Sequence, residues 1–390
     1  MNINHVQNMT TPKSSKKTLW IAVVAIVAIV LIAGIYLFYT SKQTPAPAGA
    51  PTPTKKIIVG FDVGAYGWPW RTQHIQDFIQ YAEIYKAKGN ITNYYVVASG
   101  PDVSAQISDI RGLIQKGVNV LIINPNSLTG LNPVIEEAHN AGILVLSTDQ
   151  PIDSPYSINV VINHTEWFAD MTNWVCQQLG GKGNIVIVTG IPGHPANVAR
   201  MKGAEAVLQK YPGCKVLATV EGDWSFDVAL KNMLPIIQTY RGKIDAILEQ
   251  DSHFVGVYKA FEMSGIKPGD PDFPKIWTTD YTLQSLKLWL SIIQADPQFK
   301  GYIRLNTPAY SVDSLKFAIR LAQGWRLNMS NPRIEQGKTY AGITIWLPLP
   351  PAITNNDVPR LLDQYKFMED TYQIDYVIPD EIVDQYFLKP

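Results

Sequence analysis

Short apolar runs alternate with longer amphipathic stretches from Lys56 onward, and this alternation limits the fold more than any other feature of the chain. The first set of runs is bounded by Gly, Pro, Asn or Asp and reads IIVGF (57–61), YYVVA (94–98), VLIIN (120–124), ILVLS (143–147) and INVVI (158–162). Helices are expected between them, for example over 104–116, where Ile107, Ile110 and Leu113 recur at helical spacing. Strands that alternate with helices indicate βαβ units and a mostly parallel sheet.

The alternation starts again in the second half of the chain. Its strand-like runs are NIVIVTG (184–190), KVLATV (215–220), AILEQ (246–250), KIWTT (275–279) and YIRLN (302–306). After Gly337 a last strand-like stretch, GITIWLP, leads into a Pro-rich loop and a short helical tail. Two successive α/β units predict two similar lobes, and a length of 390 residues is also too great for one compact domain.

The N-terminal stretch 19–39 carries no charge and is long enough to cross the ~30 Å hydrocarbon core of a membrane as a helix. Three lysines precede it, which predicts a cytoplasmic tail over 1–18 and an extracytoplasmic remainder. An uncleaved single-pass anchor is favoured. A cleaved signal peptide is the alternative because Ala46, Ala48 and Ala50 follow, and processing ahead of the apolar run is another. A lipoprotein anchor is excluded because no cysteine lies just after the run.

The next stretch, 40–55, is rich in Pro and Thr and predicts a stiff, extended stalk. Its threonines could carry O-linked sugar. Sequons at Asn90, Asn163 and Asn328 permit N-glycosylation in a host that performs it.

The residue totals narrow the class of partner. The chain has 33 basic and 33 acidic residues, so it offers no long-range attraction for nucleic acid, and a neutral partner fits best. The two cysteines, Cys176 and Cys214, could form one bridge outside the cell or remain buried thiols. The six histidines are scattered, so neither a metal site nor a cofactor is expected.

Enzyme signatures are missing from the sequence: there is no GxSxG, no GxxxxGK[ST] and no HExxH. Two glycine-bearing loops follow strands, GFDVGAYG (60–67) and GIPG (190–193), but neither is a GxGxxG nucleotide loop. Glycines there allow a tight turn off the carboxyl end of a parallel strand. That edge is where open α/β sheets bind ligands.

Aromatic and hydrogen-bonding residues gather at these expected strand ends. They are Trp68, Trp70, Asp149 and Gln150 in the first half, and Arg200, Trp224, Gln250, Asp251, Asp280 and Asn306 in the second. Each polar residue alone is typical of a cap or a turn. Together they predict a polar cleft walled by indoles at equivalent ends of the two units.

Such a cleft suits a neutral polyol. A hydroxyl both donates and accepts, and carboxylate, amide and guanidinium groups are well-matched partners for it. A glycosidase would also carry carboxylates and tryptophans. The mixture of amides, Arg and Asp favours recognition over acid–base catalysis.

Three stretches carry a resemblance to a known family. They are VSAQISDIRGLIQKGVNVLIINPNSLTGLNPVIEEAHNAGILVLSTDQP (103–151), GGKGNIVIVTGIPGHPANVARMKG (180–203) and PPAITNNDV (350–358). Over about 56–358 the chain resembles the type I periplasmic binding proteins, in particular the ribose/xylose/arabinose-binding group of ABC sugar importers.

The resemblance implies two Rossmann-like lobes with parallel sheets, joined by a three-crossover hinge and closing on a sugar. It places the N-terminal lobe at 56–162 plus 308–338, the C-terminal lobe at 163–307, and a hinge crossover with a C-terminal extension at 339–390. A DNA-binding helix-turn-helix would precede the first strand in repressors of this family. Here a membrane span and a stalk occupy that place, which excludes the repressor alternative.

The resemblance also implies roles for the residues. Trp68 and Trp70 would stack on the sugar from one lobe and Trp224 from the other. Asp149 would hold ring hydroxyls and Arg200 would bridge the anomeric or neighbouring oxygens. The shell would be completed by Gln250 or Asp251, Asp280 and Asn306. Gln150 stands where the family often has Arg, and Gln250-Asp251 where it usually has Asn-Asp. The identity of the sugar is therefore left open.

The sequence thus predicts a monomeric, non-enzymatic monosaccharide-binding protein, anchored in the cell membrane with its head outside, that serves ABC permease subunits. A pentose is favoured over a hexose. One alternative is a sensor ectodomain with a separate signalling partner, since the tail 1–18 leaves no room for a kinase. The other is a glycosidase on an α/β scaffold.

Overall fold

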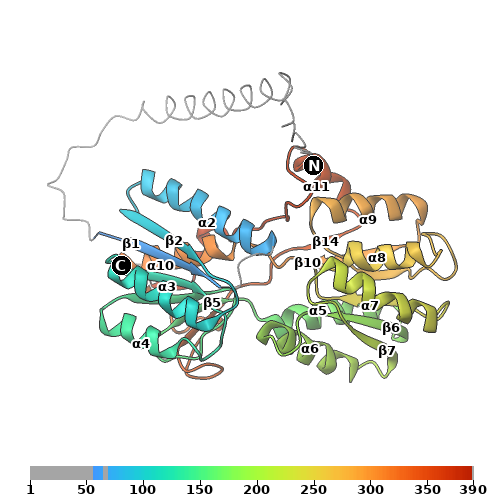
Figure 1. The fold of residues 1–390 in the computed structure, drawn as a ribbon, viewed down its shortest axis with the longest axis horizontal. Helices are drawn as coiled ribbons and strands as arrows, with labels where there is room; N and C mark the ends of the chain where they lie inside the picture. Colours follow the sequence, from blue (N-terminus) through green and yellow to red (C-terminus); the bar gives the residue numbers. More distant parts are fainter. Residues whose placement is uncertain (1–55, 65–68, 389–390) are drawn as a thin grey trace, which may run out of the picture. The chain divides into compact units, whose positions relative to one another are not determined.

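A computed structural model describes residues 56–64 and 69–388. They build two α/β lobes, each with its own sheet flanked by helices (Figure 1). The first sheet has the order β12-β13-β5-β4-β3-β1-β2. Its strands are β1 (Ile58–Val63), β2 (Asn93–Ala98), β3 (Val120–Asn124), β4 (Leu144–Thr148), β5 (Ile158–Val161), β12 (Ile334–Gln336) and β13 (Ile343–Trp346). Its helices are α2 (Pro69–Ala87), α3 (Val103–Gln115), α4 (Asn132–Asn140) and α10 (Tyr310–Ala322).

The second sheet has the order β14-β10-β9-β8-β6-β7. Its strands are β6 (Lys182–Thr189), β7 (Gly213–Glu221), β8 (Ala246–Glu249), β9 (Ile276–Thr278), β10 (Lys300–Arg304) and β14 (Ala352–Thr354). Its helices are α5 (His164–Gln178), α6 (Pro195–Leu208), α7 (Phe226–Thr239), α8 (Phe254–Met263), α9 (Leu283–Ala295) and α11 (Val358–Gln364). A small sheet pairs β11 (Arg326–Leu327) with β15 (Phe387–Leu388), next to α12 (Asp380–Asp384).

The two α/β lobes of the predicted fold class are confirmed, but the expectation of parallel sheets is only partly right. β12 runs antiparallel to β13, and β10 runs antiparallel to β14. β12 and β13 are joined by a short connection, which can link only antiparallel neighbours because a parallel pair needs a long crossover. Both sheets are therefore mixed at one edge.

Before the C-terminal segment, three crossovers carry the chain between the lobes. It leaves β5 for α5 at 161–164, leaves β10 for α10 at 304–310, and leaves β13 for β14 at 346–352. The stretch 339–390, expected to be a hinge crossover and C-terminal extension, contributes β13 to the first sheet and β14 to the second.

Local sequence explains where the elements begin. Asp102 caps α3, since its Oδ1 accepts the Ala105 N–H at 2.7 Å. Asn163 caps α5 in the same way through Thr165 and Glu166. Every residue of β3 is buried, as expected for a strand covered on both faces.

Several expectations fall outside the described residues: the tail 1–18, the anchor 19–39, the stalk 40–55, and Trp68. Across 56–64 and 69–388, none of the helices combines the length and the hydropathy that crossing a bilayer requires. Cys176 and Cys214 are free, buried thiols, and burial together with the neighbouring Cys214 raises the pKa of Cys176.

Candidate functional site

The carboxyl ends of β4, β7 and β8 carry the non-glycine residues with positive φ in the described chain. These are Asp149 (62°), Asp223 (54°), Trp224 (52°), Asp251 (85°) and Ser252 (61°). Each such conformation costs on the order of 1–3 kcal/mol and tends to persist where a site requires it. Three of the residues, Asp149, Trp224 and Asp251, are predicted site residues.

In the first lobe, Asp149 is the centre of a buried polar cluster. Its Oδ2 lies 3.1 Å from Arg71 Nη1 and accepts weaker hydrogen bonds from Asn124 Nδ2 and Gln150 Nε2 at 3.3 and 3.2 Å. Burial alone would raise the pKa of Asp149, but Arg71 and the neighbouring imidazoles lower it below its usual value. Asp149 is therefore an ionised carboxylate at neutral pH.

In the second lobe, Arg200 is the centre of another buried polar cluster. Its Nη1 donates to the Gln250 carbonyl at 2.8 Å and to Asp251 Oδ2 at 3.4 Å. Asn306 Nδ2 donates to the same Asp251 oxygen at 3.3 Å. Burial raises the pKa of Asp251 to about 7, although Arg200 opposes the shift.

His164 connects the two clusters. It begins α5 directly after the first crossover, and its Nδ1 accepts from Arg200 Nε at 3.4 Å. Its Nε2 lies 3.8 Å from Asp149 Oδ1. Burial, and then Arg200, lower the pKa of His164 to about 3, so the ring is neutral at physiological pH. Polar groups thus run without a break from Arg71 in one lobe to Asn306 at the second crossover.

Two indoles lie along this network. Trp70 donates from Nε1 to the Asn306 carbonyl at 2.7 Å and stacks on His74, with ring centroids 4.7 Å apart. Trp224 faces the Arg200 guanidinium, whose carbon is 5.6 Å from the ring centroid. Gly190 makes room for Trp224, because a Cβ on Gly190 would lie 2.0 Å from the indole. Both indoles are half-buried, and each is joined to the network by direct contacts.

The side chains of two predicted residues, Gln250 and Asp280, bind neighbouring loop and helix residues. The Gln250 side chain donates to Asn197 at 2.7 Å and accepts from the Gly190 N–H at 3.3 Å, so it holds the loop that makes room for Trp224. Asp280 accepts from the Tyr281 N–H at 2.7 Å and from Ser285 Oγ at 3.2 Å. Burial raises the pKa of Asp280.

Four residues of the site were not among the predicted ones: Arg71, Asn124, His164 and His194. Asn124 is the last residue of β3 and His164 follows β5, so the rule applied to the other strands would have found them. Arg71 follows the WPW stretch, but its partner is 78 positions away and no local signal indicates the pair. His194 lies in the loop between β6 and α6 and meets Trp224 edge-on, with centroids 4.9 Å apart.

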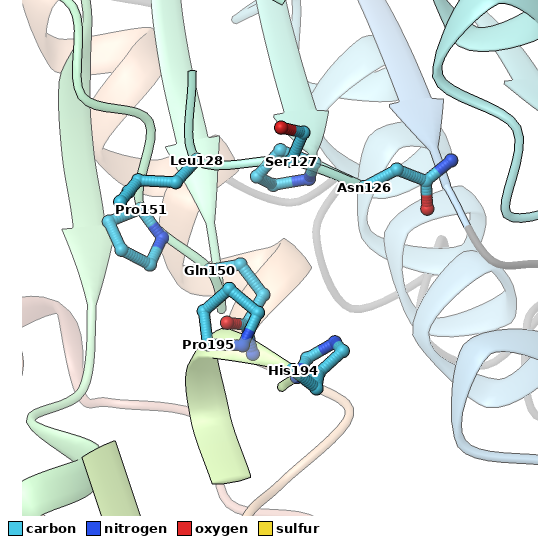
Figure 2. A pocket seen from close by; sticks show the side chains of 8 residues that line it. Asn126, Ser127, Leu128, Gln150, Pro151, His194 and Pro195 are labelled. Carbon is cyan, nitrogen blue, oxygen red and sulfur yellow. The ribbon is translucent and has the colours of Figure 1, made fainter. Parts of the chain in front are cut away.

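A small pocket adjoins this network at the ends of β3, β4 and β6 (Figure 2). The residues that line it from the first lobe follow β3 and β4, and those from the second lobe lie at the start of α6. The lining residues are Pro125, Asn126, Ser127, Leu128, Gln150, Pro151, His194 and Pro195. Gln150 belongs both to the pocket and to the Asp149 cluster.

Comparison with known proteins agrees with this fold. Residues 59–325 match the family model of the periplasmic binding protein domain. A xylitol-binding protein of Mycolicibacterium smegmatis is 33% identical over 181 residues, which are 46% of this chain and 52% of that protein. A galactofuranose-binding protein of Escherichia coli is 27% identical over 172 residues, 42% of this chain and 54% of that protein. The chain thus spans about half the length of these two relatives.

A solved structure covers more of the chain. The crystal structure of an ABC transporter solute binding protein from Thermobispora bispora superposes with a TM-score of 0.68 at 25% identity. The superposition covers 85% of this chain and 94% of the Thermobispora bispora chain.

Proposed function

Since the chain belongs to the periplasmic binding protein family, we propose that it is an extracytoplasmic solute-binding protein that captures a monosaccharide between its two lobes. A pentose such as xylose, arabinose or ribose is the favoured ligand, and a hexose is the alternative. The protein then delivers the sugar to an ABC importer.

The observation that carries the proposal is the polar network from Arg71 to Asn306, which contains charged and neutral groups from both lobes. Asp149 offers acceptors, while Arg200 and Asn306 offer donors. A sugar hydroxyl both donates and accepts hydrogen bonds, so each hydroxyl of the ligand can find a partner there. A ligand that contacts both clusters binds the closed arrangement better than the open one, and this difference drives closure.

The printed names of the relatives support a polyol ligand. One binds xylitol, a five-carbon polyol, and another binds galactofuranose, a six-carbon sugar in its five-membered ring form. These names support a polyol as the class of ligand and are compatible with either five or six carbon atoms.

The site favours binding over catalysis. A glycosidase needs two carboxyl groups that flank one bond and are free to exchange a proton or attack. Asp149 is paired with Arg71, and Asp251 with Arg200, so each carboxylate already has a cation in its own lobe. We propose no covalent chemistry.

The proposal includes an uncleaved membrane anchor at 19–39, a stalk at 40–55 and a monomeric head outside the cell. The partners are then the ABC permease subunits. A sensor ectodomain would have the same head but would act on a membrane signalling protein. Loss of sugar uptake after deletion of the protein would support the importer role, and loss of a transcriptional response with uptake intact would support the sensor.

Calorimetric titration of the purified chain with a panel of aldoses and pentitols tests the proposal. We expect one sugar per chain, with a dissociation constant in the micromolar range or below. Arg200→Met should weaken binding at least tenfold, because it leaves Asp251 buried without its cation. Arg241→Met, which removes an exposed ion pair, is the matched control. If no member of the panel binds, the proposal is wrong.

A further inference from the structure

The pocket beside the site contains hydrogen-bonding groups that the network does not use. Figure 2 shows Gln150 next to His194 and Pro195, with Ser127 and Leu128 on the opposite wall. Gln150 Nε2 donates to Asp149, but Gln150 Oε1 is buried and has no hydrogen-bond partner among the described residues. A buried, unpaired carbonyl oxygen costs about 1–3 kcal/mol, which a hydrogen-bond donor placed against it would recover.

Two other side chains in the lining, His194 and Ser127, can donate a hydrogen bond. His194 Nδ1 accepts the Ala196 N–H at 3.2 Å, so a neutral His194 carries its proton on Nε2. Burial, and then Arg71, lower the pKa of His194 to about 4, which keeps the ring neutral at physiological pH. Ser127 Oγ accepts the Gly130 N–H at 2.9 Å, which leaves the Ser127 hydroxyl hydrogen to donate.

Apart from Asn126, the remaining walls are apolar and stiff, and they limit what can enter. Pro125, Leu128, Pro151 and Pro195 surround the polar groups. The space has room for roughly one water-sized group. One hydroxyl therefore fits, whereas a second sugar ring does not.

We propose that this pocket receives the primary hydroxymethyl arm of the bound monosaccharide, an inference that rests on the proposed function. The arm's hydroxyl donates to Gln150 Oε1 and accepts from His194 Nε2 or Ser127 Oγ. Ligands with such an arm are hexopyranoses, pentofuranoses and linear pentitols. A pentopyranose has no arm and leaves Gln150 Oε1 unpaired, so the pocket selects against that ring form.

Two series of sugars with constant ring configuration test the proposal. D-Galactose, D-fucose and L-arabinopyranose differ only in the arm, which is hydroxymethyl, methyl and hydrogen in turn. D-Glucose, D-quinovose and D-xylopyranose form the second series. In the series that binds, we expect the hydroxymethyl sugar to bind roughly tenfold more tightly than its methyl analogue, as the loss of one hydroxyl from a matched pair of groups implies.

Two variants test the residues. His194→Asn keeps a side chain that caps α6 but is too short to reach the pocket, and Gln150→Met keeps the size of the side chain while removing the acceptor. The hydroxymethyl-to-methyl affinity ratio should fall to within about twofold of unity in either variant. His139→Asn, on the exposed face of α4, should keep the wild-type ratio.

The outcomes are distinguishable. If wild-type protein binds the hydroxymethyl and methyl sugars equally well, the arm pocket is wrong while the proposed function stands. If the hydroxymethyl-to-methyl affinity ratio keeps its wild-type value in both folded variants, Gln150 and His194 do not bind the hydroxyl of the arm. If no sugar binds at all, the proposed function fails and this inference fails with it. The wild-type series decides the main point even if a variant does not fold.

Discussion

At the scale of single residues, the ion pair between Arg71 and Asp149 differs from an ordinary surface contact. Both side chains are at least nine-tenths buried, and the pair joins α2 to the end of β4. The free energy of such a pair depends on both members being present, because either one alone is a buried charge without compensation.

Arg71→Met should therefore lower the free energy of unfolding at pH 7 by about 3 kcal/mol. Arg111→Met is the matched control, since Arg111 pairs with Glu137 at 2.6 Å on the surface and should contribute less than about 1 kcal/mol. Urea denaturation followed by circular dichroism measures both. Equal losses in the two variants would show that the Arg71 pair is no more important than a surface pair.

Asp62 predicts a dependence of stability on pH. Burial, reinforced by Asp109 and opposed by the Gln106 hydrogen bond, raises the pKa of Asp62 to about 8. The folded state thus holds this proton more tightly than the unfolded state does. The contribution of Asp62 to stability is fully present below about pH 4 and is lost as the pH rises through about 8.

Asp62→Asn keeps the acceptor for Gln106 Nε2 and does not titrate. Compared with the wild type, this variant should gain relative stability as the pH rises from 4 to 8, by a few kcal/mol at the upper end. Urea midpoints across that range check the prediction, with the exposed Glu136→Gln as control. A difference between Asp62→Asn and wild type that stays constant with pH would contradict it.

At this scale the sequence predicted several residues that the structure brings into one polar network. The rule that ligand groups follow parallel strands led to Asp149, Asp251 and Asn306, because strand ends can be read from local patterns. It could not assign Gln250 to the Gly190 loop, nor pair Arg71 with Asp149, because both contacts join residues far apart in the chain.

At the scale of elements, a C-terminal segment at 370–378 contacts both lobes. In the second lobe, the Leu283 N–H donates to the carbonyl of Tyr372 in this segment. In the first lobe, Asp313 on α10 accepts from the N–H of Ile378 in the same segment. Gln73 on α2 forms a reciprocal pair with the backbone of Gln373, both hydrogen bonds being 2.9 Å. This segment is a fourth connection between the lobes, in addition to the three crossovers.

Gln73→Leu should lower the free energy of unfolding by about 2 kcal/mol, because the backbone groups of Gln373 would be buried without partners. Amide hydrogen exchange in 370–378 should become faster in the same variant. Gln76→Leu, exposed on the same helix, is the control and should change neither quantity. Unchanged exchange in the Gln73 variant would mean that other contacts hold the segment.

The strands and helices were largely predictable, whereas the edges of the sheets and this segment were not. VLIIN corresponds residue for residue to β3, because a strand buried on both faces is continuously apolar. The partners of β14 and of Gln373 depend on where the chain returns after the third crossover, which no local period encodes.

At the scale of the whole molecule, the proposed sugar capture requires side chains from two lobes to meet at one ligand. Trp70 binds the Asn306 carbonyl, Asn306 binds Asp251, and Asp251 binds Arg200, which faces Trp224. The indoles expected to face each other are therefore joined by a continuous set of contacts rather than buried in separate cores.

A crystal structure of the protein with its bound sugar would show whether both lobes contact one ligand. We expect a single monosaccharide within hydrogen-bond distance of Asp149 from the first lobe and of Arg200 from the second. A sugar that contacts only one lobe, or that binds away from both residues, would show that the proposed two-lobe site is wrong.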